Sequence, residues 1–298
     1  PGLVCSDVPP DEYRSMPPTQ PQSLTLAELE RHLWGAADLL RGSIDSGDFK
    51  HYIFGLLFYK RLCDVWEEEY EQRLAEYDDA DLAADPEEHR FHIPPGCFWA
   101  DVRQQSVDIG TALNTSFWAI QDVNPRLQGV FQDVDFANKQ RFPDAMLERL
   151  LQHFERYRMR RADVPSTVLG DAYEYLIAKF ADDAGKKGGE FYTPKQVVRI
   201  MVEILRPEEG QTVYDPTCGS GGMLLEAVHY MERHGLNPKA LTLFGQEKNL
   251  NTWAICKMSL FLHDIDDAFV ERGDTLLDPK HFAAAAAKPL RRFDLVLA

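Results

Sequence analysis

The sequence predicts a helical domain followed by an α/β domain built around a parallel sheet. Apolar residues recur at helical spacing through much of the first 185 residues. After the glycine-rich segment 185–189, short apolar strands alternate with helices up to the end of the chain. Such alternation is typical of a parallel sheet with right-handed crossovers, and 298 residues are enough for two domains.

The front of the chain divides into a tail and a helical domain. Residues 1–22 contain six prolines and predict an extended tail. For the domain 23–185, the spacing of apolar residues predicts helices at about 25–41, 49–77, 107–121, 143–160 and 166–183. The polar stretch 78–95 is expected to be a loop. The acidic run Glu67-Glu68-Glu69 is interpreted as a solvated helix face.

The back of the chain, 186–298, predicts the first part of an α/β domain. We expect strands at 212–214, 241–244, 268–272 and 293–298, and helices at about 194–205, 222–234 and 249–263.

Charge is distributed unevenly between the two parts. The net charge is −16, of which residues 1–185 carry −15 and residues 186–298 carry −1. A protein that grips DNA alone usually presents a basic stripe, because neutralising phosphates dominates affinity. Either the protein does not bind DNA, or another subunit or a further segment makes most of the DNA contacts. The densest basic cluster, Arg156, Arg158, Arg160 and Arg161, fits a solvated helix face better than a DNA contact.

Several classes of protein are disfavoured. The longest apolar run, 52–59, is too short to span a bilayer, and the N-terminal residues lack the pattern of a signal peptide, so we expect a cytoplasmic protein. The five cysteines are odd in number and widely spaced, without a C-x-x-C pair. This pattern favours reduced thiols, and neither a disulfide framework nor a metal site is predicted.

The strongest motif is the run DPTCGSGG, Asp215 to Gly222, where a predicted strand ends and a helix begins. Glycines there let a ligand approach the backbone, and the free amides of the helix start suit a carboxylate or phosphate. The motif is neither a dinucleotide fingerprint, because Leu224 replaces the third glycine, nor a P-loop. By itself it also fits a turn that binds nothing.

Acidic residues follow the next two strands. Glu247 ends the second strand, 28 residues past Gly219, and Asp274 follows the third. The carboxyl ends of parallel strands share one edge of the sheet, and an acid at the end of strand two commonly holds ribose hydroxyls. Each acid alone could be a solvated loop residue. Together with Asp215 they predict a ligand site.

The hexapeptide GEFYTP, residues 189–194, precedes the glycine-rich motif by about 20 residues. This tandem resembles class I S-adenosylmethionine-dependent methyltransferases that modify adenine N6 in DNA. It is most similar to the modification subunit of type I restriction–modification systems. Residues 54–62, FGLLFYKRL, and 64–66, DVW, resemble the N-terminal domain of that subunit. The resemblance covers residues 25–298 and implies a helical N-terminal domain followed by a truncated Rossmann-like methyltransferase domain.

The resemblance implies that the cofactor is S-adenosyl-L-methionine. The residues that would close over its methionine end are Glu190, Phe191, Tyr192, Thr193, Pro194 and Lys195. Those that would hold its amino-acid portion are Asp215, Thr217, Gly219, Ser220, Gly221 and Gly222. Glu247 would bind the ribose hydroxyls and Asp274 the adenine amine. For Phe191 and Tyr192, ordinary core packing is the alternative.

In this family the catalytic tetrapeptide, Asn/Asp-Pro-Pro-Phe/Tyr, ends the fourth strand. No such tetrapeptide occurs in residues 1–298, and it is expected directly after Ala298. We therefore assign no catalytic residue within the chain and expect it to be an inactive fragment of a longer enzyme. In that enzyme, polar acceptors would bind the adenine amine and an aromatic ring would stack on a flipped base.

The resemblance implies a site-specific DNA adenine-N6 methyltransferase subunit. Its partners would be double-stranded DNA, bound through the assembled complex, and a specificity subunit; a restriction subunit with nuclease and translocase activity is left open, and no membrane is involved. Two alternatives remain at this point. One is a class I methyltransferase with a non-DNA substrate, and the other is a non-catalytic binding subunit that keeps the fold.

Overall fold

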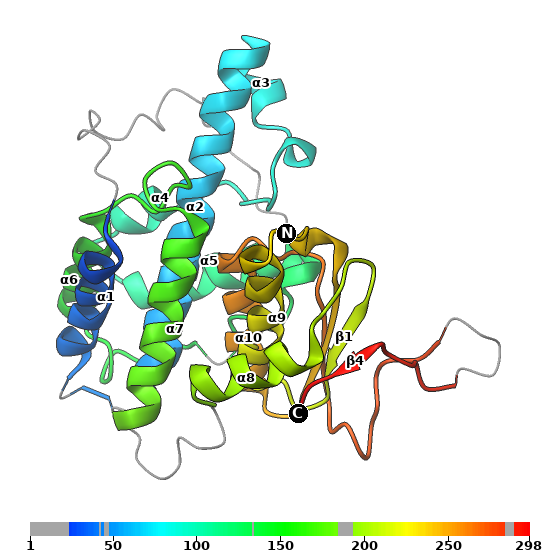
Figure 1. The fold of residues 1–298 in the computed structure, drawn as a ribbon. Helices are drawn as coiled ribbons and strands as arrows, with labels where there is room; N and C mark the ends of the chain where they lie inside the picture. The colour runs from blue at the N-terminus through cyan, green and yellow to red at the C-terminus, as the bar shows by residue number, and fades with distance from the viewer. Residues whose placement is uncertain (1–23, 42, 45–47, 133, 184–192, 284–288) are drawn as a thin grey trace. The chain divides into compact units, whose positions relative to one another are not determined.

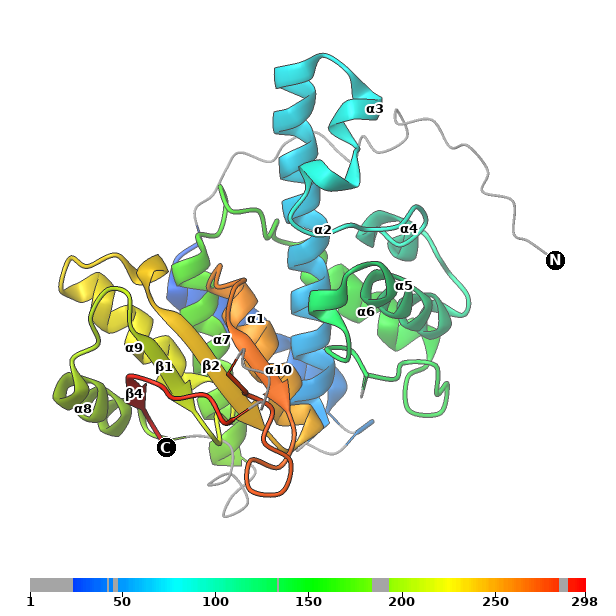
Figure 2. The same ribbon diagram turned by 90° about the vertical axis from the view of Figure 1, so that its right-hand side faces the viewer.

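The fold was analysed in a computed structural model that describes residues 24–41, 43–44, 48–132, 134–183, 193–283 and 289–298 (Figures 1 and 2). The chain forms two compact units. Within the described ranges, the helical unit comprises Tyr59–Gln128 and Asp135–Pro165, and the sheet unit comprises Leu26–Phe58, Gly129–Val134 and Ser166–Ala298. The predicted tail, 1–22, lies outside the described residues.

The helical unit contains most of α2 (Phe49–Tyr77), which the sequence predicts with the same bounds. Its other elements are α3 (Ala80–Ala83), η3 (Pro86–Glu88), α4 (Trp99–Arg103), α5 (Ile109–Val123), η4 (Pro125–Leu127) and α6 (Asp144–Glu155). Its core is aromatic: Tyr59, Phe117 and Phe136 are buried, and the Tyr59 hydroxyl donates to the Cys97 carbonyl over 2.8 Å.

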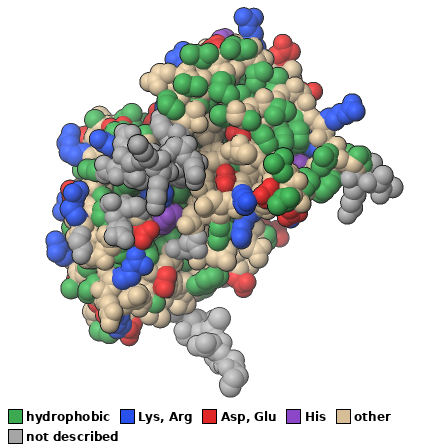
Figure 3. All heavy atoms as spheres, turned by 90° about the horizontal axis from the view of Figure 1, so that it is seen from below, with side chains coloured by type: hydrophobic (Ala, Val, Ile, Leu, Met, Phe, Trp, Pro, Cys, Tyr) green, Lys and Arg blue, Asp and Glu red, His purple; other side chains and the backbone are tan. Residues whose placement is uncertain are grey.

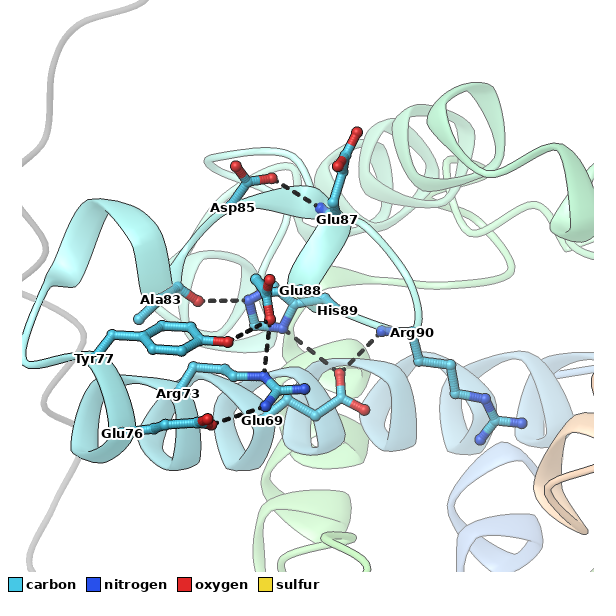
Figure 4. Close-up of polar contacts among 10 residues, drawn as sticks. All are labelled: Glu69, Arg73, Glu76, Tyr77, Ala83, Asp85, Glu87, Glu88, His89 and Arg90. Carbon is cyan, nitrogen blue, oxygen red and sulfur yellow. Dashed lines mark hydrogen bonds and ion pairs between the residues drawn. The ribbon is translucent and has the colours of Figure 1, made fainter.

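Residues 78–95 are not only loop, as the sequence predicts, because two short helices interrupt them. The Asp79 carboxylate accepts hydrogen bonds from the amides of Asp81 and Leu82, which starts α3. Asp85 caps η3 in the same way. Figure 4 shows how this segment is fixed to α2: the Glu69 carboxylate accepts from the Arg90 amide at 3.1 Å and lies 3.5 Å from His89 Nδ1.

The acidic face of α2 is not solvated, so that interpretation of Glu67-Glu68-Glu69 is wrong. Glu68 is buried and accepts hydrogen bonds from the amides of Arg161 and Ala162, at 2.8 and 2.9 Å. Burial, together with the nearby Asp64 carboxylate, raises the pKa of Glu67 to about 7. Glu68 and Glu69 therefore accept from backbone amides of other segments and do not form a solvated surface.

The basic cluster after α6 also departs from its interpretation as a helix face. Helix α6 ends at Glu155, and the backbone beyond it bonds to α2: the Met159 amide donates to Asp64 over 2.6 Å. Arg160 forms a two-point ion pair with Glu71, at 2.7 and 2.9 Å, and Arg161 pairs with Glu69. Two of the four arginines are thus neutralised within the helical unit.

The sheet unit begins with α1 (Leu26–Leu40), which packs against α7 (Ser166–Asp183). It then contains α8 (Lys195–Leu205), β1 (Thr212–Asp215), α9 (Gly222–Arg233), η6 (Pro238–Ala240), β2 (Thr242–Glu247), α10 (Leu250–Leu262), β3 (Phe269–Arg272) and β4 (Leu295–Val296). The predicted helices and strands of this part are all present, with ends shifted by a few residues.

The four strands form one parallel sheet in the order β3-β2-β1-β4. Helices α8, α9 and α10 lie on one side of it (Figure 1). Side chains alternate between the faces of a strand, so Val213 and Asp215 point toward these helices while Tyr214 points away. The expected fold class, a helical region followed by a Rossmann-like methyltransferase domain, is confirmed.

On the other face of the sheet, His281 and Phe293 pack against side chains of β1 and β2: both rings contact Tyr214 and Phe244. Phe244 also stacks on Phe269 of β3. The fully buried Gln246 side chain fixes the backbone at 278–280, because its NH2 group donates to the Asp278 carbonyl and its oxygen accepts from the Lys280 amide, at 2.8 and 3.1 Å.

Negative findings on this fold concern the described residues only. No helix among them is both long and apolar enough to cross a bilayer. Within the same ranges, no group of three or more His, Cys, Asp or Glu side chains is arranged to hold a metal ion. The four described cysteines, Cys63, Cys97, Cys218 and Cys256, are free thiols.

Candidate functional site

The motif DPTCGSGG forms the turn between β1 and α9. Asp215 ends the strand and accepts a hydrogen bond from the Thr217 amide at 3.0 Å. Gly219 and Gly221 both have left-handed backbone, with φ of 54° and 88°. A Cβ on Gly221 would lie 2.9 Å from the Cys256 sulfur, so only glycine fits there without a shift. Gly222 is the first residue of α9.

Glu247, at the end of β2, is held against this turn. Its Oε2 accepts from the Gly219 amide at 3.0 Å, and its Oε1 accepts from the Asn249 amide at 2.7 Å. A carboxylate oxygen has two lone pairs, so each oxygen keeps one acceptor position. The side chain is only partly buried, and its orientation is fixed before any ligand arrives. It can therefore accept from a pair of hydroxyls.

A cavity of about 100 Å³ opens between the turn and helices α7, α8, α9 and α10. Its polar lining includes Glu174, Thr193, Lys195, Asp215, Thr217, Ser220, Glu226 and Ser259. A space of this size holds more than one water, so it can take a small polar group. Three carboxylates and one amine line it, so it suits a ligand group that carries positive charge.

Asp215 is the most buried acid of the cavity, with 2% of its surface exposed. Burial raises its pKa to about 7, and the nearby Glu247 charge adds to this, against the opposing effect of the Thr217 amide. A cation placed in the cavity would stabilise the ionised carboxylate. The affinity of the cavity for a cation therefore depends on pH near neutrality.

Asp274 follows β3 but is engaged elsewhere. Its Oδ1 accepts from the amides of Leu276 and Leu277, and its Oδ2 lies 2.9 Å from the Lys248 ammonium. The Lys248 ammonium keeps the pKa of Asp274 below its ordinary value. The sequence-based role of Asp274, to bind an adenine amine, remains a prediction.

The segment before α8 lies partly on the cavity. Thr193 and Lys195 line it, whereas Pro194 starts α8, its carbonyl accepting from the amides of Val197 and Val198. Glu190, Phe191 and Tyr192 lie outside the described residues, so their assignment stays a prediction.

Comparison with known proteins agrees with this architecture. The family described as N-6 DNA Methylase matches residues 165–298, and the family described as HsdM N-terminal domain matches residues 29–154. The two matches lie in the same order along the chain as the predicted helical and α/β domains. The chain belongs to the type I restriction–modification methylase subunits.

Individual relatives of this family support the assignment. The MpnII methylase subunit of Mycoplasma pneumoniae is 28% identical over 277 residues, which cover 80% of this chain and 51% of the relative. The MjaVIII methylase subunit of Methanocaldococcus jannaschii is 31% identical over 262 residues, covering 82% and 42%. The chain thus spans about half the length of the curated methylase subunits that it matches.

A solved structure gives the same result. The type I methyltransferase subunit from Streptococcus thermophilus superimposes with a TM-score of 0.71 and 29% identity, over 86% of this chain and 60% of that one. The expected family and fold are therefore confirmed. The domain boundary at residue 185 stays a prediction. The compact sheet unit also includes α7, which precedes that boundary.

The cavity residues that lie within helices were not predicted from the sequence. Glu174 and Ile177 are on α7, Glu226 is on α9 and Ser259 is on α10. No local motif marks them, because each lies within an amphipathic pattern that predicts ordinary packing. A signal was available only in the charge of Glu174, which lies between Tyr173 and Tyr175.

Proposed function

We propose that the full-length protein containing this chain is a DNA adenine-N6 methyltransferase subunit that uses S-adenosyl-L-methionine. One observation supports this most: the β1–α9 turn borders an acidic, amino-acid-sized cavity and also contacts the fixed carboxylate of Glu247. The cavity fits the charged amino-acid end of the cofactor. Glu247 fits its ribose hydroxyls.

Figure 3 shows the molecule from below, the side on which β4 ends in Figure 1. Side chains of both charges lie among hydrophobic ones on this face.

In this proposal the chain's residues bind and orient the methyl donor. The amides at the start of α9 and the Lys195 ammonium would bind the carboxylate of the cofactor. The Asp215 carboxylate would offset the positive charge of the cofactor's amino-acid end. The sulfonium of the bound cofactor supplies an activated methyl group. Because the ribose is held by Glu247 and the amino-acid end by the cavity, the methyl group is fixed relative to the sheet edge, and positioning of this kind accounts for much of a transfer rate.

Glu247→Ala is expected to weaken binding of S-adenosylmethionine tenfold or more. The substitution removes charge-assisted hydrogen bonds to two hydroxyls, which cost about 1.5–3 kcal/mol when lost. Calorimetric titration of the full-length protein measures the change. Glu271→Ala, an exposed acid on the neighbouring strand β3, is the matched control and should bind normally. Unchanged affinity of the Glu247 variant would remove this residue from the site.

We further propose that sequence-selective DNA binding needs a specificity subunit. Residues 1–185 have a net charge of −15, and Arg160 and Arg161 are already paired with acids of α2. Duplex DNA would meet repulsion from this surface within a screening length of about 8 Å at physiological salt. Local contacts by the remaining basic side chains would therefore contribute only once a partner holds the duplex.

Binding titrations of the full-length subunit, with specific and scrambled duplexes, check this proposal. Without the partner we expect weak, salt-sensitive binding that does not distinguish the two duplexes. Adding the specificity subunit should make binding selective. Tight and selective binding by the subunit alone would contradict the division of labour.

A further inference from the structure

We propose that Glu174, on α7, is a further cofactor-binding residue: its carboxylate positions the Lys195 ammonium at the cavity and binds the α-ammonium of the methionine portion. The inference rests on the proposed use of S-adenosylmethionine. It adds a helix that precedes the GEFYTP segment to the binding site, and it gives the cavity a specific ligand group.

The geometry places Glu174 at the cavity wall, not in solvent. The residue is 9% exposed, lines the cavity, and its Oε2 forms an ion pair with the Lys195 Nζ. His263 Nε2 lies 3.7 Å from the Glu174 Oε1, which is beyond hydrogen-bond distance. A carboxylate oxygen at the wall of a cavity can accept from a ligand ammonium.

His263 does not neutralise this oxygen. Burial, with a further contribution from the neighbouring His229, lowers the pKa of His263 to about 4, so the ring is uncharged at neutral pH. A Cβ added to Gly170 would lie 2.3 Å from atoms of the same ring, so the imidazole packs directly on the backbone of α7. Glu174 therefore keeps one oxygen for the cavity.

A second polar group in the cavity independently indicates a ligand. The Ser259 side chain, on α10, is fully buried and lines the cavity, yet its hydroxyl has no hydrogen-bond partner in the described structure. A buried hydroxyl that is not bonded costs free energy. In a cavity that fits an amino-acid group, such an atom is expected to bond to the ligand or to a water held with it.

Charge decides which group binds where. An amino-acid end carries one ammonium and one carboxylate, and the Glu174–Lys195 pair presents the complementary charges side by side. The carboxylate would lie between Lys195 and the α9 amides, and the ammonium between Glu174 and Asp215. A ligand without the amino-acid end gains nothing from this pair, and that difference makes the role testable.

The test compares two ligands on the full-length protein by calorimetry. S-adenosylhomocysteine carries the amino-acid end, and 5′-methylthioadenosine lacks it. Glu174→Gln keeps the size of the side chain but removes its charge. The affinity for S-adenosylhomocysteine should therefore fall about tenfold or more. Its affinity for 5′-methylthioadenosine should stay within about twofold of the wild type, because no contact to the nucleoside is lost.

Asp171→Asn is the matched control. Asp171 also lies on α7, 3.9 Å from the same Lys195 ammonium, but its side chain is 46% exposed and does not line the cavity. This variant should bind both ligands normally. If Glu174→Gln fails to fold, Lys195→Met provides the same comparison at a half-exposed position. This variant should lower the affinity for S-adenosylhomocysteine and leave that for 5′-methylthioadenosine unchanged.

Three results would count against the proposal. If Glu174→Gln lost affinity equally for both ligands, Glu174 would only support the fold. Unchanged affinity of this variant for S-adenosylhomocysteine would remove Glu174 from the site. A wild-type protein that binds neither ligand would instead overturn the proposed cofactor, and this inference with it. The wild-type titration thus separates failure of the inference from failure of the proposed function.

Discussion

Gly221→Ala is expected to abolish most cofactor binding and to destabilise the sheet unit. Gly221 has a φ of 88°, where a side chain strains the backbone by about 1–3 kcal/mol. Its Cβ would also lie 2.9 Å from the sulfur of Cys256, which is fully buried, and overpacking of this kind costs about 1–3 kcal/mol more. Denaturant unfolding and a cofactor titration measure the two effects.

Two other glycines separate the causes of this loss. Gly210 also has a positive φ, 85°, but a Cβ there would meet nothing within 4 Å, so Gly210→Ala should show the cost of strain alone. Gly222 lies next to Gly221, without positive φ and with open space around its Cβ position, so Gly222→Ala should fold normally. If Gly221→Ala were no less stable than Gly222→Ala, the turn would not need glycine for its shape.

Local patterns predicted the elements that carry an unbroken apolar period. Helices α2 and α7 have the predicted bounds, and each predicted strand of the parallel sheet is present. The prediction was wrong for the end of α6, because the backbone after Glu155 bonds to side chains of α2. The Met159 amide reaches Asp64, 95 residues away, and no local period carries that information.

The sequence points to candidate site residues where a strand ends and not where a helix passes. Asp215 and Glu247 are predicted because parallel strands bring their carboxyl ends to one edge. Glu174 is not predicted, since its place at the cavity depends on how α7 packs beside α8 and α10, which bring Lys195 and Ser259 to the same cavity. The interpretation of Glu67-Glu68-Glu69 was wrong for the same reason, because these side chains have partners in the distant segments 89–90 and 160–162.

Affinity for S-adenosylmethionine is expected to fall as the pH is lowered below about 7. The pKa of Asp215 is raised to about 7, first by burial and also by Glu247, so the carboxyl is largely protonated in acid. A cationic ligand binds the ionised form, and the affinity should approach a tenfold loss for each pH unit below this value. The same shift lowers stability as the pH rises from 3.8 to about 7, because the unfolded chain releases this proton first.

Titrations between about pH 5.5 and 7.5 check this dependence, since the α-amino group of the ligand itself ionises near 7.7–8.0. Asp215→Asn is the control: it should bind more weakly at pH 7.5 and lose most of the slope. Other groups, such as Glu67 with its pKa of about 7 in the helical unit, would affect both proteins equally. A slope that persists in Asp215→Asn would assign the pH dependence to another group. Its disappearance, with a flatter stability profile between pH 4 and 7, would show that this buried acid is kept for binding at the expense of stability.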